Sequence, residues 1–426
     1  MSLISRNTFN QLLGLSFGGK RDTYAVFGYN KKPTTEQFRL RYEHEGIASR
    51  IVDAFPNAIW ANPPKIGLAD SELRTSWDAL AYKSKLYNAL SRADKLVGIE
   101  PYSVLLLGFD DSSDLSTPVD ANKVTDLLYV QPYGASRAQI KKWDEDTKSR
   151  HFGLPLLYEI NPGQENNNSV TSAAASMLNA ANISANLPNR KKLKIHWTRI
   201  LHIAENCLED NIFGIPRLQI VNNYLDDLLK VVGGTSETYW ITSNRGLQVD
   251  VDKEMELNED DAAALEAELD EYIHNLRRVI RTRGVKIDNL GSNTPNPRDT
   301  FAMILSVISG TTGIPRRILV GSEIGQLAST QDRANWAERI SERRQLFCEP
   351  VIVAPLIQRF ASYGLLPDVP NDKDLINWPS AFLMNPLESA QTNAQRARSL
   401  INTAKALTVR EDLLTVDEAR AIIELT

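Results

Sequence analysis

The residues best suited to catalysis in this sequence are its five histidines. His196 opens the only His-x-Thr triplet, which ends at Thr198. Paired triplets of this form supply one histidine base and one histidine acid for phosphoester hydrolysis, so a single copy does not complete the chemistry. His202 follows on the same predicted strand face, but no nearby cysteine or carboxylate completes a set of metal ligands. We therefore expect structural histidines, with no catalytic residues, no metal site and no cofactor.

Other catalytic motifs are also missing from the sequence. It contains neither a phosphate-binding loop of the Gly-x-x-x-x-Gly-Lys-Ser/Thr form nor a glycine-rich dinucleotide motif after a strand. It also lacks His-Glu-x-x-His and Gly-x-Ser-x-Gly. The pair Asp110-Asp111 is interpreted as the exit of a strand, and Glu259–Asp261 as compensation of a helix dipole. The sequence thus predicts a protein that is not an enzyme.

Three further features leave alternatives open. The basic run Arg190–Lys194 is more typical of a solvated strand edge than of a contact with phosphate or an acidic partner. Arg316 and Arg317 suit either the capping of carbonyl groups or pairing with carboxylates of a neighbouring chain. The loop 321–330 has small side chains and separates two strong helical patterns, so it is either a plain connector or a mobile element that projects into a cavity or channel.

Length and composition exclude several classes of protein. The 426 residues predict two to four subdomains, and a hydrophobic fraction of 42% with 24% charged residues is typical of globular chains. The net charge of -5 argues against holding nucleic acid over a large basic face. The longest apolar run, Tyr102–Phe109, is too short to cross a bilayer, and the N-terminus does not resemble a signal peptide. Cys207 and Cys348 form no motif, so a reducing cytosol is the default compartment.

In the N-terminal half, the pattern predicts a polar, flexible arm followed by mixed helices and strands. We expect a short helix from Gly46 that Pro56 ends, and a second helix over 71–93. Strands are expected at 102–109, 127–130 and 195–203, the last of which alternates apolar and polar residues. The Asn-, Ser- and Ala-rich stretch 163–189 has little to bury and is interpreted as an exposed insertion.

The C-terminal half is predicted to be mainly helical around a small mixed unit. A helix from Pro216 to Gly233-Gly234 is apolar over about half its circumference, which is wider than one buried stripe needs. Strands at 238–242, 247–251 and 285–288 and a capped helix over 258–283 form an expected ββαβ unit. The remaining expectations are a buried helix at 301–308, a long helix from Gln331 interrupted by Pro350 and Pro355, and a helical tail over 387–426.

The order of these segments resembles the portal proteins of tailed bacteriophages. The likeness is strongest to the branch found in Mu-like prophages, which has an anti-CBASS-protein-like N-terminal domain. It rests on Arg41–Trp60, on Ile195–Ile203 followed by Gly214–Leu218, and on Thr312–Gly325. Together these stretches cover most of the chain from about 36 to 365.

The resemblance implies an α+β portal fold with wing, stem, clip and a small helical crown, assembled as a ring. The expected divisions are a flexible N-terminal arm (1–35), a first wing segment (36–215, with the exposed insertion 163–189), a stem helix (216–233), the clip (234–296), a second stem helix (297–312), a tunnel-loop region (313–332), a second wing segment (333–386) and the helical crown or C-terminal tail (387–426).

Two groups of site residues follow from the same resemblance. The tunnel loop in the DNA channel would consist of Ser322, Glu323, Ile324, Gly325, Gln326, Leu327, Ala328 and Ser329. The stem surface that contacts neighbouring subunits would consist of Ile220, Tyr224, Leu228, Val231, Phe301, Ile304 and Ile308.

The implied function is a DNA conduit at one capsid vertex, used for genome packaging and ejection. Its partners would be eleven further copies of the chain, double-stranded DNA, the terminase, the head–tail connector or adaptor and the major capsid protein, without a membrane. The chain would be found in the virion, and in the host cytoplasm during assembly. Two alternatives are a cyclic-nucleotide phosphodiesterase-related enzyme, which the missing second His-x-Ser/Thr triplet disfavours, and a non-viral soluble interaction protein.

Overall fold

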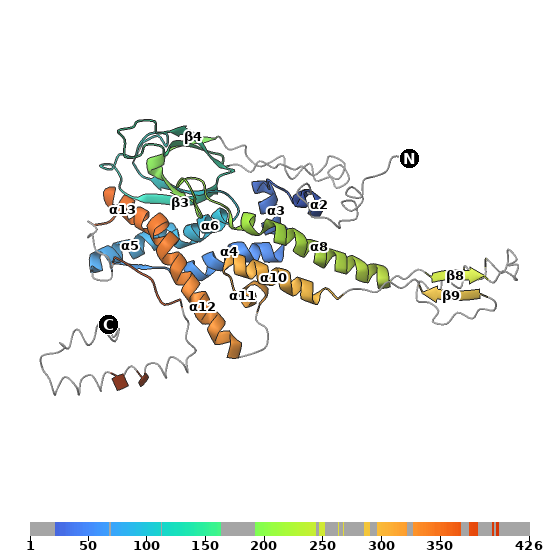
Figure 1. Cartoon of the computed structure of the whole chain (residues 1–426). Coiled ribbons are helices and arrows are strands. Elements are labelled where there is room, and N and C mark those ends of the chain that lie inside the picture. The colour runs from blue at the N-terminus through green and yellow to red at the C-terminus, as the bar shows by residue number, and fades with distance from the viewer. Residues whose placement is uncertain are drawn as a thin grey trace.

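The computed structural model shows an elongated α+β chain with a wide helical and sheet body and a long projecting helix pair (Figure 1). It describes residues 22–67, 70–111, 113–162, 192–243, 247–251, 285–289, 296–321, 327–367 and 375–381, with a few isolated positions besides. The expected insertion 163–189, the helix expected over 258–283 and nearly all of the expected crown 387–426 lie outside the described residues.

The N-terminal segment is more structured than the sequence suggested. Helix α2 spans Thr23–Phe27 within the expected flexible arm, and α3 follows over Thr35–His44 with a capping box at Thr34. Helix α4 covers Gly46–Trp60, so the expected end at Pro56 is wrong. Pro56 is buried inside the helix, because its missing backbone donor is tolerated where eight buried side chains hold the helix against the core.

The single helix expected over 71–93 is two helices. Helix α5 spans Ser71–Ser84 and α6 spans Leu86–Val97. Lys85 separates them with a φ of 51°, a left-handed conformation that lets its amide bond back to Ala81 and Tyr82. Asp70 caps the start of α5, because its carboxylate accepts from the amides of Glu72 and Leu73.

Two three-stranded antiparallel sheets form the rest of the wide body. Strand β2 (Ser103–Phe109) is central in the first sheet, between β3 (Leu127–Gly134) and β7 (Ile200–Ile203), and is buried throughout. The second sheet has the order β4 (Ala138–Trp143), β5 (Pro155–Ile160) and β6 (Leu193–His196). The strands expected at 102–109 and 127–130 are thereby confirmed.

The single strand expected over 195–203 is divided between these two sheets. Strand β6 ends at His196, a 3-10 turn covers Trp197–Arg199, and β7 then pairs with β2. The turn is held by buried Arg199, whose guanidinium forms two hydrogen bonds with the Asp111 carboxylate at 3.1 and 2.6 Å. The alternation of apolar and polar residues over 195–203 therefore does indicate strands, but the chain passes from the second sheet to the first in the middle of this segment.

Helix α8 runs over Arg217–Ser243, well past the expected end at Gly233-Gly234. The prediction of a strand at 238–242 is consequently wrong, and residues 234–243 of the expected clip belong to α8. The hydroxyls of Thr235 and Thr238 bond to carbonyls four residues earlier and follow the helix through the glycines. Beyond α8 lie the two expected strands β8 (Leu247–Val251) and β9 (Val285–Asn289), and they pair in antiparallel register.

Helix α10 (Arg298–Thr312) lies along α8, and it is followed by the short α11 (Arg316–Val320). Helix α12 begins at Leu327, four residues before the expected start, and runs to Arg343. It continues through a π-helical segment, Arg344–Val353, into α13 (Ala354–Ser362). Pro350 thus causes a change of helical pitch rather than the expected interruption.

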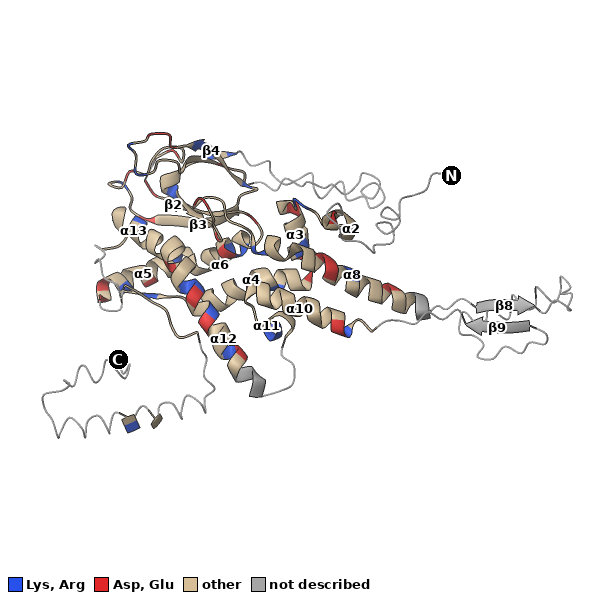
Figure 2. Cartoon of the chain, viewed as in Figure 1, with Lys and Arg blue, Asp and Glu red and all other residues tan. Residues whose placement is uncertain are grey.

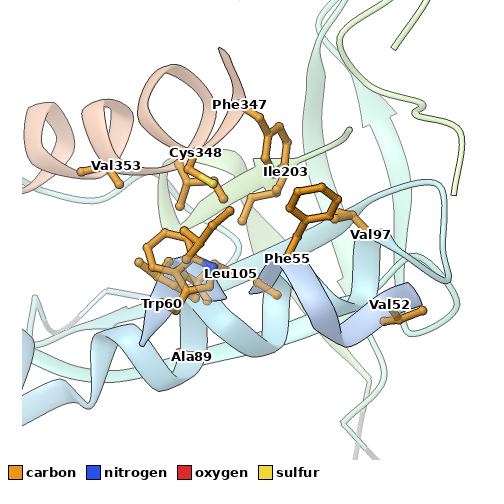
Figure 3. Close-up of a cluster of buried hydrophobic side chains, with 14 of the residues drawn as sticks. Val52, Phe55, Trp60, Ala89, Val97, Leu105, Ile203, Phe347, Cys348 and Val353 are labelled. Atoms are coloured by element: carbon orange, nitrogen blue, oxygen red, sulfur yellow. The ribbon is translucent and has the colours of Figure 1, made fainter. Parts of the chain in front are cut away.

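The main core lies where these helices meet the first sheet. Figure 3 shows Phe55 and Trp60 of α4, Leu105 of β2, and Phe347 and Cys348 of the π-helical segment converging in one cluster. A smaller cluster fills the space between the two sheets, centred on Tyr102, Tyr158 and Ile195. The two short strands β1 (Lys65–Ile66) and β10 (Ile376–Asn377) pair at the margin of the main core.

Candidate functional site: the stem helices and their anchorage

The predicted tunnel loop falls partly outside the described residues. Positions 322–326 are not described, and Leu327, Ala328 and Ser329 form the first turn of α12 instead of a loop. The chain turns directly after α11, because Gly321, the residue that follows this helix, has a φ of 103°. The portion of the predicted loop that the structure describes is therefore a helix start, which corrects that portion of the prediction.

The predicted stem surface divides into buried and exposed residues. Leu228, Ile304 and Ile308 are buried in the chain's own core, and their contact with a neighbouring subunit stays a prediction. Val231 and Phe301 are partly buried and pack against that core. Ile220 and Tyr224 remain exposed, at 49% and 37%.

Sequence reasoning missed the apolar side chains that the stem helices leave in solvent. These exposed residues of α8 and α10 are Leu229, Val232, Tyr239, Trp240, Met303 and Val307. Trp240 is 71% exposed and Met303 is 61% exposed, which is unusual for such large apolar side chains. The breadth of the apolar arc on α8 was visible in the sequence, but α10 covers only one side of it. We call the exposed residues, with Ile220 and Tyr224, the stem face.

The beginning of α8 is held by the N-terminal segment. The Tyr29 hydroxyl donates to Asp227 Oδ2 at 2.5 Å, and Lys230 Nζ donates to the Phe27 carbonyl at 2.6 Å. The hydrogen bond to Asp227 is the main reason that the pKa of Tyr29 is raised to about 12. Arg41 of α3 adds an ion pair with Asp226. Residues 22–34 therefore act as a strap across α8, which corrects the expectation of a free arm up to residue 35.

A buried ion network joins α8 to the body. Asp94 of α6 receives hydrogen bonds from Arg343 at the end of α12 and from the indole of Trp60. Arg217, the first residue of α8, also approaches Asp94, and Glu205 pairs with both arginines. The charges of two arginines and two carboxylates balance, which permits their burial.

The network sets the ionisation of its members. Burial raises the pKa of Asp94, but the charge and hydrogen bonds of Arg343 outweigh it, so the pKa lies below its ordinary value. Burial lowers the pKa of Arg343, but Asp94 and Glu205 more than compensate and raise it well above its usual range. The pKa of Arg217 is lowered by burial despite the same carboxylates. Asp94 and Arg343 are thus charged near neutral pH.

Two of the described histidines, His196 and His202, form hydrogen bonds within the fold. His202 Nε2 lies 2.8 Å from the Ile212 carbonyl, which can only accept, so Nε2 carries the proton and Nδ1 accepts from Tyr158. His196 Nδ1 lies 3.0 Å from the Thr198 hydroxyl of its own triplet. Among the described residues no group of three or more His, Cys, Asp or Glu side chains is arranged to hold a metal ion. In the same residues, no helix has both the length and the apolar character that crossing a bilayer requires.

Charge is distributed unevenly over the helices. Figure 2 shows acidic and basic residues alternating along α12, whereas α10 is largely uncharged and α8 carries its charge mainly near the body. The projecting helices thus present apolar surface rather than a basic stripe. Such a surface suits contacts between protein chains better than a tight grip on phosphate.

Comparison with known proteins identifies the family. A model described as phage portal protein matches residues 37–403. The chain belongs to the phage portal protein family. The match runs from within α3 to beyond β10, and it confirms the resemblance found in the sequence.

Two solved structures share the same fold across nearly the whole length of the portal chain. A chain from the virion of a native gene transfer agent particle has a TM-score of 0.53 at 13% identity, covering 98% of this chain and 99% of that one. A chain from the neck of an empty gene transfer agent particle, computed with C6 symmetry, has a TM-score of 0.57 at 15% identity, covering 94% and 98%. An HK97 family phage portal protein from Corynebacterium diphtheriae matches with a TM-score of 0.39 at 8% identity, covering 82% and 95%. No curated protein matches the chain.

Proposed function

We propose that this chain is the subunit of a ring of twelve copies at one capsid vertex, through which double-stranded DNA enters during packaging and leaves during ejection. Membership of the portal protein family supports a portal role in a phage or phage-like particle. The observation that carries the ring is the stem face, because two packed helices leave large apolar side chains without cover within the described residues. A closed ring covers such a face in every copy.

The remaining segments receive roles from this arrangement. The segment around β8 and β9, at the far end of α8, would dock the terminase and later the head–tail connector. Residues 322–329, of which the last three form the first turn of α12, would border the DNA channel, and the wide body would contact the major capsid protein. The chain would assemble in the host cytoplasm and remain in the virion. The absence of a broad basic stripe on the described helices supports a conduit, since strong phosphate contacts would slow sliding DNA.

Electron microscopy of the purified chain and of particles that contain it tests the ring directly. Annular particles with a central hole are expected, and class averages give the copy number. Only globular monomers, both in isolation and in particles, would overturn the proposal. A neck computed with C6 symmetry around a structurally similar chain is compatible with twelve copies.

Deletion of residues 322–329 tests the tunnel loop separately. The deletion variant should fold and form rings, because α11 and the rest of α12 remain, but particles that carry it should package or retain less DNA. Replacement of the same residues by an equally long Gly-Ser segment is the matched control for loop length. Normal packaging by the deletion variant would remove the tunnel-loop assignment while leaving the ring intact.

A further inference from the structure

A long furrow separates α10 and α11 from α12. It consists of three adjoining hollows of about 910, 520 and 190 Å³. The first two share Gly310, Gly313, Arg339 and Glu342, and the last two share Phe55, Glu205, Asn206, Thr311, Thr312 and Arg343. We call this continuous surface the α10–α12 furrow.

The inner end of the furrow holds polar groups that lack hydrogen bonds. Arg217 is 9% exposed and lines the smallest hollow, where its Nε and Nη1 make no hydrogen bond. Glu205 Oε2 is also buried without a hydrogen bond, although it lies 3.4 Å from Arg217 Nε. Buried donors and acceptors without a hydrogen bond are costly, even within an ion pair, so this end of the furrow is suited to a further polar group.

The walls of the furrow mix apolar and charged side chains. Phe55 and Ile51 lie on the inner side, and Ile220 and Leu346 are at the rim, where they are 49% and 72% exposed. The outer hollow has equal numbers of positive and negative side chains: Arg316, Arg317 and Arg339 against Asp332, Glu338 and Glu342. A surface with balanced charge at its outer end and apolar side chains at its inner end matches a protein surface, whereas DNA would require an excess of positive charge.

Gly310 gives the furrow an unobstructed wall. It lies in the last turn of α10, borders both larger hollows, and a Cβ added there would meet no atom within 4 Å. The absence of a side chain lets the backbone of another segment come close to α10 at this position.

We propose that the α10–α12 furrow is the socket for a neighbouring copy of this chain in the portal ring. The inference rests on the proposed ring and adds where one subunit inserts into the next. A ring needs two different faces on each copy, so a hollow face must meet a projecting one. Ile220 belongs both to the stem face and to the rim of the furrow, which makes the two surfaces continuous.

Filling the furrow tests the proposal. Gly310→Trp should leave the chain folded, because the added side chain enters open space, and should reduce the fraction of chains in rings by about tenfold, as expected when a bulky group blocks the centre of an interface. Gly310→Ala is the matched small replacement and should assemble normally. Ala79→Trp places the same bulk on an exposed position of α5, outside the furrow, and should also assemble.

Mass photometry and negative-stain microscopy measure assembly, and circular dichroism melting measures folding in each full-length variant. Loss of rings in Gly310→Trp with an unchanged melting temperature supports the socket. Normal rings in Gly310→Trp overturn the socket but not the portal role. Absence of rings in the unmodified chain counts against the proposed function itself.

Photo-crosslinking identifies the occupant. A benzoylphenylalanine placed at Thr311, which is exposed and lines the furrow, is irradiated in rings assembled from an equal mixture of ¹⁴N- and ¹⁵N-labelled chains. Mixed-isotope crosslinked peptides are expected, and their sequence names the inserted segment. Crosslinks with one isotope alone would place another segment of the same chain in the furrow and overturn the proposal.

Discussion

Arg343 and Asp94 form a buried, two-pronged ion pair although they are 249 positions apart in the chain. Arg343 Nη2 lies 2.5 Å from Asp94 Oδ1, and Nη1 lies 3.0 Å from Oδ2. Arg343 is the last residue of α12, and the first residue of α8, Arg217, approaches the same carboxylate. The Asp94 side chain of α6 therefore holds both the beginning of α8 and the end of α12 in place.

Removal of one partner of this pair should be strongly destabilising. Arg343→Met leaves a buried carboxylate with less compensation, and we expect it to lower the free energy of unfolding by about 3–5 kcal/mol. The double variant with Asp94→Asn should lose less than the sum of the single variants, because the unpaired charge is then absent. Arg339→Met removes an exposed pair with Glu342 and should cost less than about 1 kcal/mol. Urea unfolding of the unmodified chain, the two single variants, the double variant and Arg339→Met measures these differences, and additive single effects would contradict the coupling.

Protonation of His202 should make the fold sensitive to mild acid. Burial lowers its pKa, and the hydrogen bond to the Ile212 carbonyl offsets only part of that effect. The unfolded chain, with an ordinary histidine, therefore binds a proton at higher pH than the folded chain does. The contribution of neutral His202 to the free energy of unfolding is therefore fully present above about pH 6.5. It decreases as the pH falls below that value, by up to about 1.4 kcal/mol per pH unit.

Unfolding measurements between about pH 7.5 and 5 check this effect, since an ordinary histidine titrates within that range. In the wild type the free energy of unfolding should decrease with falling pH, and in His202→Gln that decrease should be smaller. A glutamine can still donate to the Ile212 carbonyl and accept from Tyr158, so the variant should fold. Equal slopes in the two chains would assign the acid sensitivity to other groups.

The strap over α8 should loosen when the Tyr29 hydroxyl is removed. Tyr29→Phe deletes the donor to Asp227, and the loss should be about 1 kcal/mol, enough to raise amide exchange in α2 several-fold. The raised pKa of Tyr29 gives the matching pH effect. The stabilisation by its hydrogen bond to Asp227 is complete below about pH 10 and is lost as the pH rises toward about 12. Tyr24→Phe is the control, and hydrogen–deuterium exchange of both variants is the measurement. Equal exchange would show that the strap does not depend on this hydrogen bond.

The elements of the fold that sequence reasoning found are those with local signals. The apolar run at 103–109 predicted β2 because a fully buried strand needs no alternation. The break at Lys85 was missed because a left-handed lysine carries no glycine or proline signal. At Pro56 and at Gly233-Gly234 the sequence predicted a helix end where the helix continues, because these residues ordinarily terminate helices. Packing against the core keeps α4 helical through Pro56, and the hydroxyls after the glycines bond to α8 carbonyls.

The candidate site was predictable only in outline. A wide apolar arc on the helix after Pro216 indicated two packing surfaces, but the sequence did not tell which side α10 covers. Leu228 therefore entered the predicted interface while its neighbour Leu229 did not. The ion network was invisible because its members come from four separate segments and no spacing relates them.

The contrast between Leu228 and Leu229 tests the stem face. Leu229 is 57% exposed, so Leu229→Lys should leave the melting temperature of the monomer unchanged and prevent ring formation. Leu228 is 7% exposed, so Leu228→Ala should lower the free energy of unfolding by about 2–5 kcal/mol, whatever its effect on assembly. Size-exclusion chromatography with light scattering measures assembly, and thermal melts measure stability. Rings of normal size in Leu229→Lys would remove this residue from the interface, because a lysine ammonium cannot be buried between apolar helices without a partner.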